Sequence, residues 1–350
     1  MTLENNQIDF LDNLPVHQLT LSNTNGQTVV LYNYGIIIQS WLVNTKKHGR
    51  KDVLLGRNDW KGYLQDHPNF GCIIGRYANR ICKGQLPIGE NIFQLSKNLN
   101  GHHLHGGFSG FGKKVWDIQN IFIQPKEAEI HLSYISKDGE EGYPGNLATK
   151  IIVRFTEENE LIFDMHAIAD KDTVCNMSQH CYFNLGNEDH ILNHEIQING
   201  FQIAETDNEL IPTGILKDVK GTPFDFTKPK MIGSSIHETD ALLVYGNGYD
   251  INYVLNNNCN PYDQPVARVF EENNELQLDV YTSLPGLQFY TGNWLEGVEG
   301  KNKQRYKKYA GLCLEPQFYP DSPHHREFPD TVLLAGEGYH QWIKYKLIGV

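Results

Sequence analysis

Apolar and polar residues alternate with a period of two in many short stretches of the chain. Residues 130–134, 161–167 and 276–280 all follow this pattern, and in 161–167 the apolar positions alternate with residues that include Asp164 and His166. This alternation places the apolar side chains of an extended segment on one face and is typical of half-buried β-strands. The chain is therefore predicted to be predominantly β.

Turn-forming residues separate several of these stretches. Asn25-Gly26, residues 88–91 and residues 157–160 each lie between two apolar segments, which predicts three β-hairpins. Two further segments, FTEENEL at 155–161 and FEENNEL at 270–276, are similar to each other. One pair of similar hairpins does not establish an internal repeat.

Helical periodicity is rare, with a turn or two expected at residues 58–64 and 301–309. The chain has 350 residues with 32 Gly and 15 Pro, and no Pro/Ser-rich linker divides it. Length alone would allow two domains of about 150 residues. Antiparallel sheets packed as one large β-sandwich, with few short helices, explain the strand content best, so residues 1–350 are predicted to form a single all-β domain.

The charge balance narrows the range of partners. The chain carries 42 acidic and 30 basic residues, a formal net charge of -12, which disfavours nucleic acid and anionic membranes as partners. Residues 1–14 do not resemble a signal peptide, and no apolar run of about 18 residues is present. We expect a cytoplasmic protein. Its cysteines are expected to be free, buried thiols: Cys72, Cys82, Cys175, Cys181, Cys259 and Cys313.

Residues 75–81 (GRYANRI) contain two candidate ligand-binding arginines, Arg76 and Arg80. A guanidinium group donates two parallel hydrogen bonds to neighbouring oxygens, such as adjacent hydroxyls. For either arginine alone, a surface Arg–Glu pair is the more frequent explanation.

Residues 102–107 (HHLHGG) contain three imidazoles. On a strand, His103 and His105 would share a face while His102 points away, so the segment supplies two metal ligands at most, and no cysteine or carboxylate motif completes the set. No metal site is predicted. The two glycines after His105 allow close backbone approach and favour an imidazole that faces a ligand.

Two further ionisable residues stand in apolar surroundings. His180 lies among aromatic residues in SQHCYFNLG, and Glu315 follows the apolar strand pattern of residues 310–314. A histidine exchanges protons near neutral pH, and a buried carboxylate is a candidate general base. The alternatives are a core histidine bonded to a backbone carbonyl and a carboxylate paired with a core arginine. The usual serine-hydrolase, P-loop, dinucleotide and zincin motifs are absent.

Seven segments taken in order resemble the aldose 1-epimerase (galactose mutarotase) family. They are GRYANRI at 75–81, LHGG at 104–107, WD at 116–117, His180 with YFNL at 182–185, GYD at 248–250, PGLQFYTGN at 285–293 and LEPQFYPD at 314–321. The resemblance covers most of the chain. It implies a β-supersandwich and a cofactor-free reaction that interconverts the α and β anomers of hexoses such as galactose and glucose.

The resemblance also implies a role for each matched residue. Glu315 matches the general base of the family and His180 the general acid. The residues that match sugar-binding positions are Asn79, Arg80, His105, Asp250 and Gln288. Two positions depart from the usual family pattern, because Ile251 replaces a common His and Pro316 a common Thr.

The resemblance leaves the substrate open. The alternatives are an epimerase of maltose or of a hexose 6-phosphate, or a carbohydrate-binding protein without activity. A small-molecule sugar is the expected partner of a monomer or homodimer, and residues 324–328 are expected at the rim of the cleft. If Glu315 must be ionised and His180 protonated, the rate should fall at low pH as Glu315 gains a proton and at high pH as His180 loses one.

Overall fold

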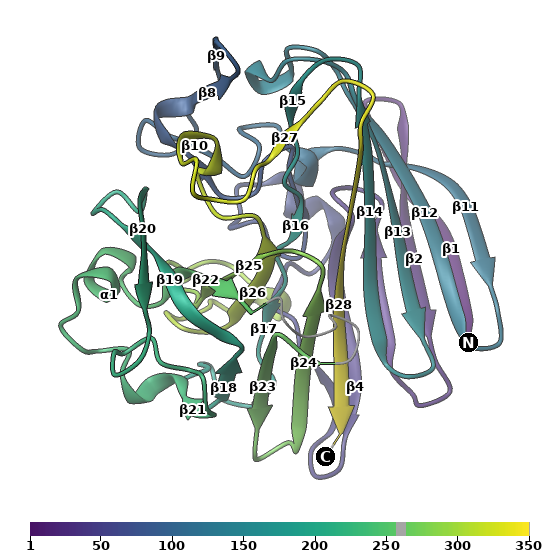
Figure 1. The fold of residues 1–350 in the computed structure, drawn as a ribbon. Helices are drawn as coiled ribbons and strands as arrows, with labels where there is room; N and C mark the ends of the chain where they lie inside the picture. The colour runs from purple at the N-terminus through teal and green to yellow at the C-terminus, as the bar shows by residue number, and fades with distance from the viewer. Residues whose placement is uncertain (257–263, 350) are drawn as a thin grey trace.

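The computed structural model describes residues 1–256 and 264–349, and these are built mainly of antiparallel strands (Figure 1). Within these ranges the single α-helix is α1 (Ala241–Gly246). Asp240 caps it by accepting a hydrogen bond from the Leu242 N–H. The all-β prediction is confirmed.

The largest sheet has nine strands. In spatial order they are β11 (Asp117–Ile123), β12 (Glu127–Ser136), β13 (Leu147–Thr156), β14 (Glu160–Ala169), β28 (Gly338–Gly349), β24 (Leu276–Thr282), β23 (Ala267–Glu271), β18 (Glu195–Ile198) and β21 (Lys230–Met231). Strand β28 pairs with both β14 and β24. The two similar hairpins of the sequence, β13–β14 and β23–β24, therefore lie on either side of the last strand.

A six-stranded sheet carries much of the candidate site. Its order is β17 (Tyr182–Phe183), β26 (Leu312–Gln317), β25 (Gly286–Tyr290), β22 (Asp250–Leu255), β19 (Gly200–Thr206) and β20 (Pro212–Asp218). A five-stranded meander from the N-terminal part of the chain comprises β1 (Thr2–Leu11), β2 (Leu14–Ser22), β3 (Thr28–Tyr32), β4 (Ile37–Thr45) and β5 (Gly49–Asp52).

Short strand pairs and 3-10 turns complete the structure. The pairs are β6 (Ile73–Ile74) with β16 (Ser178–Gln179), β7 (Arg80–Ile81) with β10 (His103–Leu104), β8 (Gln85–Ile88) with β9 (Asn91–Gln94), and β15 (Thr173–Val174) with β27 (Val332–Leu333). The 3-10 turns are Trp60–Leu64, Cys82–Gly84, Phe111–Lys113, Glu140–Gly142, Ile232–Ser234, Lys301–Lys303 and Ser322–His324.

The predicted local elements can be compared with these bounds. The three hairpins are confirmed as β2–β3, β8–β9 and β13–β14. The helical turn expected at residues 58–64 is the 3-10 turn Trp60–Leu64, but the one expected at 301–309 ends at Lys303. Helix α1 was not predicted, because six residues are too few to show a helical period.

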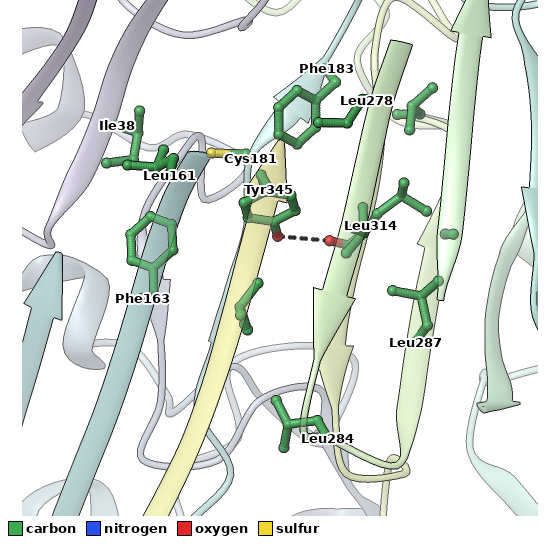
Figure 2. Packing of buried hydrophobic residues seen from close by; sticks show 14 of the residues in the cluster. Ile38, Leu161, Phe163, Cys181, Phe183, Leu278, Leu284, Leu287, Leu314 and Tyr345 are labelled. Atoms are coloured by element: carbon green, nitrogen blue, oxygen red, sulfur yellow. Dashed lines mark hydrogen bonds between the residues drawn. The ribbon is translucent and has the colours of Figure 1, made fainter. Parts of the chain in front are cut away.

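The main hydrophobic core combines residues of the nine-stranded, six-stranded and five-stranded sheets (Figure 2). Four of its residues are completely buried: Leu314 and Leu287 of the six-stranded sheet and Leu278 and Tyr345 of the nine-stranded sheet. The Tyr345 hydroxyl donates a hydrogen bond to the Leu314 carbonyl oxygen at 2.8 Å, drawn dashed in Figure 2. This bond joins the two sheets one residue before Glu315.

The described cysteines are free thiols, and Cys72, Cys175, Cys181 and Cys313 are buried. Cys82 is only partly buried, so the expectation of burial was wrong there; it begins the 3-10 turn that follows the short strand β7. Cys259 falls outside the described residues. No helix in the described ranges has the length and apolar character needed to cross a bilayer.

Candidate active site

Three neighbouring strands place polar side chains on one face of the six-stranded sheet. Glu315 in β26 lies directly opposite Gln288 in β25, and Asp250 begins β22 beside them. Because side chains alternate along a strand, Leu314 and Leu287 point into the core while Glu315 and Gln288 point to the other side. The same alternation that builds the core thus builds one wall of the site.

The strand pair β7–β10 contributes a second group of polar residues. Leu104 pairs with Arg80, and the flanking Asn79 and His105 both have positive φ, 67° and 52°. The His105 N–H donates to the Asn79 carbonyl oxygen at 3.1 Å, and the Asn79 N–H donates to His105 Nδ1 at 3.1 Å. These two bonds lock both left-handed residues against each other.

His180 lies in the short connection between β16 and β17. Its N–H donates to the Cys72 carbonyl oxygen at 2.9 Å, and its own carbonyl oxygen accepts the Gly71 N–H at 2.9 Å. The imidazole stacks on Tyr182, with ring centroids 5.0 Å apart. Backbone bonds and ring stacking together fix the position of the imidazole.

All seven residues predicted for the site line one cavity of about 810 Å³. They are Asn79, Arg80, His105, His180, Asp250, Gln288 and Glu315. The first and last of them, Asn79 and Glu315, lie 236 positions apart in the sequence (315 − 79), so it is the fold that brings the set together.

A polar network fixes Asp250 in the wall of this cavity. Gln288 Nε2 donates to Asp250 Oδ1 at 2.6 Å, and Arg80 Nη2 lies 3.4 Å from Asp250 Oδ2. Arg80 also donates to Asn79 Oδ1 at 3.2 Å. The buried Oε1 of Gln288 has no hydrogen-bond partner within the protein, so it remains available to a hydroxyl donor.

His180 and Glu315 form a buried pair, with Nε2 and Oε2 3.6 Å apart and both side chains at most 5 % exposed. Burial lowers the pKa of His180 to about 4. Burial raises the pKa of Glu315 well above its usual value, and the neighbouring charge of Asp250 adds to this shift while Arg80 opposes it. Glu315 Oε2 has no hydrogen-bond partner within the protein.

These directions reverse the ionisation order expected from the sequence. A His180 imidazolium loses its proton at a lower pH than Glu315 does, so between the two steps the pair shares one proton that resides mainly on the carboxyl group. The physical reason is desolvation, which disfavours the charged form of both groups.

Ligand atoms of His105, His180 and Glu315 lie within 4.8 Å of one another, which raises the question of a metal ion. The Asn79 N–H occupies the lone pair of His105 Nδ1, so a neutral His105 carries its proton on Nε2. Neither ring nitrogen then offers a free lone pair to a cation. This tautomer makes His105 a hydrogen-bond donor and disfavours a metal at this position.

The structure corrects the assignment of faces in residues 102–107. Strand β10 ends at Leu104, and the left-handed backbone of His105 interrupts the alternation. His102 and His105 therefore both line the cavity. His103 points away and is held by Tyr143 Oη at 2.6 Å and by the Ser96 carbonyl oxygen at 2.7 Å.

Two other expectations differ from the structure. Arg76 is neither a surface partner of a glutamate nor a cavity residue, because it is buried and donates to the Pro144 carbonyl oxygen and to Ser136 Oγ. Residues 324–328 do not line the cavity. His324 instead contacts the buried Asp321 at 2.7 Å.

Several cavity residues were not predicted from the sequence. They include the aromatic residues Tyr182, Tyr290 and Trp294, and residues 208–210 of the β19–β20 connection. Trp294 is 63 % exposed, so it lies at the mouth of the cavity rather than in the core. Tyr182 and Tyr290 lie inside quoted segments, YFNL and PGLQFYTGN, but nothing in either segment distinguishes a cavity aromatic from a core aromatic.

Comparisons with known proteins identify the family of the chain. The family model for aldose 1-epimerase matches residues 17–346. Galactose mutarotase from Homo sapiens is 38% identical over 325 residues (91% of each chain), and aldose 1-epimerase from Escherichia coli is 35% identical over 341 residues (96% of each). The crystal structure of galactose 1-epimerase from Lactobacillus acidophilus superposes with a TM-score of 0.88 at 28% identity, covering 99% of this chain and 98% of that one. The chain therefore belongs to the aldose 1-epimerase family.

Proposed function

We propose that this cavity interconverts the α and β anomers of a hexose such as galactose or glucose, with Glu315 as general base and His180 as general acid. The observation that carries the proposal is the buried His180–Glu315 pair, whose facing atoms lie 3.6 Å apart in a cavity with an unpartnered carboxyl oxygen. Membership of an isomerase family supports the same reaction class.

Mutarotation requires an acid and a base on one sugar ring. The base removes the proton from the C1 hydroxyl, and the acid protonates the ring oxygen as the C1–O5 bond breaks. The C1–C2 bond then rotates, and the ring closes on the opposite face of the aldehyde with the two proton transfers reversed. Each positioned donor or acceptor typically contributes about 10² to 10⁴ in rate.

The remaining predicted residues would hold the sugar. The proposed donors are His105 Nε2–H, for which the Asn79 N–H sets the tautomer, and the Arg80 guanidinium. Asp250 would accept from sugar hydroxyls, since Gln288 and Arg80 fix its carboxylate. Trp294 at the mouth offers a ring face for stacking against the C–H groups of a sugar.

The charges of the cavity favour an uncharged sugar over a hexose phosphate. Arg80 is the single Arg or Lys among the described lining residues. The same lining contains four acidic side chains: Asp66, Glu209, Asp250 and Glu315. A phosphate group is usually held by several cationic side chains. Maltose remains an alternative that the same assay tests.

Polarimetry tests this proposal directly. Freshly dissolved α-galactose, α-glucose and maltose are each mixed with the protein, and the decay of optical rotation is followed. Glu315→Gln should fold, still bind sugar, and lose about 10² to 10⁴ in rate. Glu209→Gln is the matched control, because this carboxylate lines the same cavity but is 57% exposed and is assigned no role. A Glu315→Gln variant with the wild-type rate would remove Glu315 from the mechanism.

We further propose that residues 1–350 form one domain that works without a cofactor in the cytoplasm, as a monomer or homodimer. The largest buried cluster supports a single domain, since it contains residues from Leu19 to Leu347.

A further inference from the structure

A second cluster of histidine and carboxylate groups lies on the outer face of the nine-stranded sheet. Asp164 and His166 stand two residues apart in β14, and His340 lies directly opposite His166 in β28. Their side chains are 16%, 40% and 56% exposed, respectively. None of the three lines the sugar cavity, so the mechanism proposed above does not use them.

The ligand atoms of this cluster lie close to one another. Asp164 Oδ1 lies 2.6 Å from His340 Nε2 and 3.2 Å from His166 Nε2. All three atoms lie within 4.8 Å of one another, and the two imidazole rings stack in parallel with centroids 4.4 Å apart. Ligand atoms about 2.0 to 2.2 Å from a tetrahedral zinc ion stand about 3.3 to 3.5 Å apart. Side-chain rotations that also break the parallel stacking of the two rings would point both Nε2 lone pairs at one ion.

Neighbouring strands keep the carboxylate in place. Asp164 Oδ2 accepts a hydrogen bond from Arg154 Nη2 at 3.0 Å, and Arg154 Nε donates to Glu129 Oε1 at 2.9 Å. Lys150 of β13 lies opposite His166. The two cations and the two carboxylates balance, so a divalent ion meets no net positive charge from these four groups. Asp164 Oδ1 faces the two imidazoles.

We propose that Asp164, His166 and His340 form a surface site for a borderline divalent cation such as Zn²⁺, Ni²⁺ or Cu²⁺, with its remaining coordination position open to water. Two imidazole nitrogens and one carboxylate oxygen suit these ions, whereas Mg²⁺ and Ca²⁺ prefer oxygen ligands. Because the ligands come from β14 and β28, a bound ion ties the C-terminal strand to the sheet. An ion that binds only the folded chain raises its stability.

The test uses the full chain after treatment with a chelator. Calorimetric titration with ZnCl₂ should give one saturable site per chain, and MgCl₂ should give none. The melting temperature should rise by about 4 °C when the free zinc concentration is a hundred times the Kd of the site. His340→Asn and His166→Asn should each weaken zinc binding at least tenfold. Co²⁺ should give visible absorption bands in the wild type that both variants lose.

Two control variants separate this site from other candidates. His131→Asn removes a histidine that faces a single carboxylate, Glu129, at 3.0 Å in β12, and it should leave zinc binding unchanged. Glu315→Gln should also leave zinc binding unchanged, because the sugar cavity is a separate site. The polarimetric rate of His340→Asn should equal that of the wild type, whatever substrate the cavity takes.

The proposal is overturned if zinc gives no saturable binding up to about 100 μM, which corresponds to a binding free energy of only about 5 kcal/mol. It is equally overturned if the histidine variants bind zinc as the wild type does. Loss of binding in Glu315→Gln but not in His340→Asn would assign the ion to the sugar cavity instead.

Discussion

The hydroxyl of Tyr345 touches the backbone immediately before both residues of the proposed acid–base pair. It donates to the Leu314 carbonyl oxygen at 2.8 Å and lies 3.5 Å from the Gln179 carbonyl oxygen. Leu314 precedes Glu315, and Gln179 precedes His180. We expect Tyr345→Phe to lower both stability and catalytic rate, because it removes a hydroxyl of the nine-stranded sheet that contacts both segments.

The size of the stability loss follows from what the substitution removes. Phenylalanine keeps the ring and its packing on Phe163 and Phe183, so no large cavity forms. A buried hydrogen bond is lost and its acceptor remains buried, which costs about 1 to 2 kcal/mol. At about 2.1 cal/mol/K per residue, a chain of this length unfolds with an entropy of about 0.7 kcal/mol/K. The melting temperature should therefore fall by about 1.5 to 3 °C.

The effect on rate follows from the position of the lost bond. Displacements of about 1 Å cost up to about a hundredfold in rate, and the smaller shift expected here should lower kcat severalfold while KM changes less. Calorimetry gives the melting temperature, and polarimetry gives the rate.

Tyr253→Phe is a matched control for the rate effect. Its hydroxyl donates to the Phe224 carbonyl oxygen at 3.0 Å and is equally buried, but neither residue adjoins Glu315 or His180 in sequence. We expect this variant to lose a similar amount of stability with an unchanged kcat. If Tyr345→Phe also keeps the wild-type kcat, the hydroxyl serves stability alone and the reasoning about positioning is wrong.

Three further substitutions test the electrostatics and packing around the site. Asp250→Asn removes a charge that raises the pKa of Glu315, so the alkaline limb of the kcat–pH profile should move to lower pH. If the limb does not move, it does not report the ionisation of Glu315. Glu315 has a folded-state pKa above the unfolded value, so its contribution to stability is complete below about pH 4.5 and is lost as pH rises through the folded pKa. Glu315→Gln should therefore melt increasingly above the wild type as the pH rises, and a pH-independent difference would contradict the raised pKa. Arg76→Met removes buried bonds to Pro144 and Ser136 and should cost about 3 kcal/mol or more in urea unfolding, with a near-normal rate per folded molecule because Arg76 does not line the cavity.

Local sequence patterns predicted the strands and hairpins because these depend on alternation and turn chemistry. The same rule failed at His102 and His103. A strand was assumed to continue through residue 105, but β10 is two residues long and His105 turns into the left-handed region. A pattern of three imidazoles does not reveal where a short strand ends.

The pairing of distant strands was not predictable from local patterns. Gln288 lies opposite Glu315 because β25 pairs with β26 in one register, and a shift of one residue would turn Gln288 into the core. The mouth of the cavity also depends on tertiary placement, since Trp294 and residues 208–210 come from connections between strands. The family resemblance supplied the seven site residues, and the fold supplied the reason that they meet.

The burial of the His180–Glu315 pair suits the proton balance of the proposed reaction. Ring opening moves one proton onto Glu315 and one proton away from His180, so the pair holds one proton before the step, on His180, and after it, on Glu315. Because that proton resides mainly on Glu315, the form that starts ring opening is the minor one and the form that starts ring closure is the major one. A desolvated site disfavours the doubly protonated and the fully deprotonated pair, since each carries a net charge. Burial lowers the pKa of His180 to about 4 and raises that of Glu315, so the one-proton state occupies the pH range between these two pKa values. Burial of the pair therefore favours the one-proton state on which the reaction depends, and the two limbs of the pH profile belong to the pair as a whole.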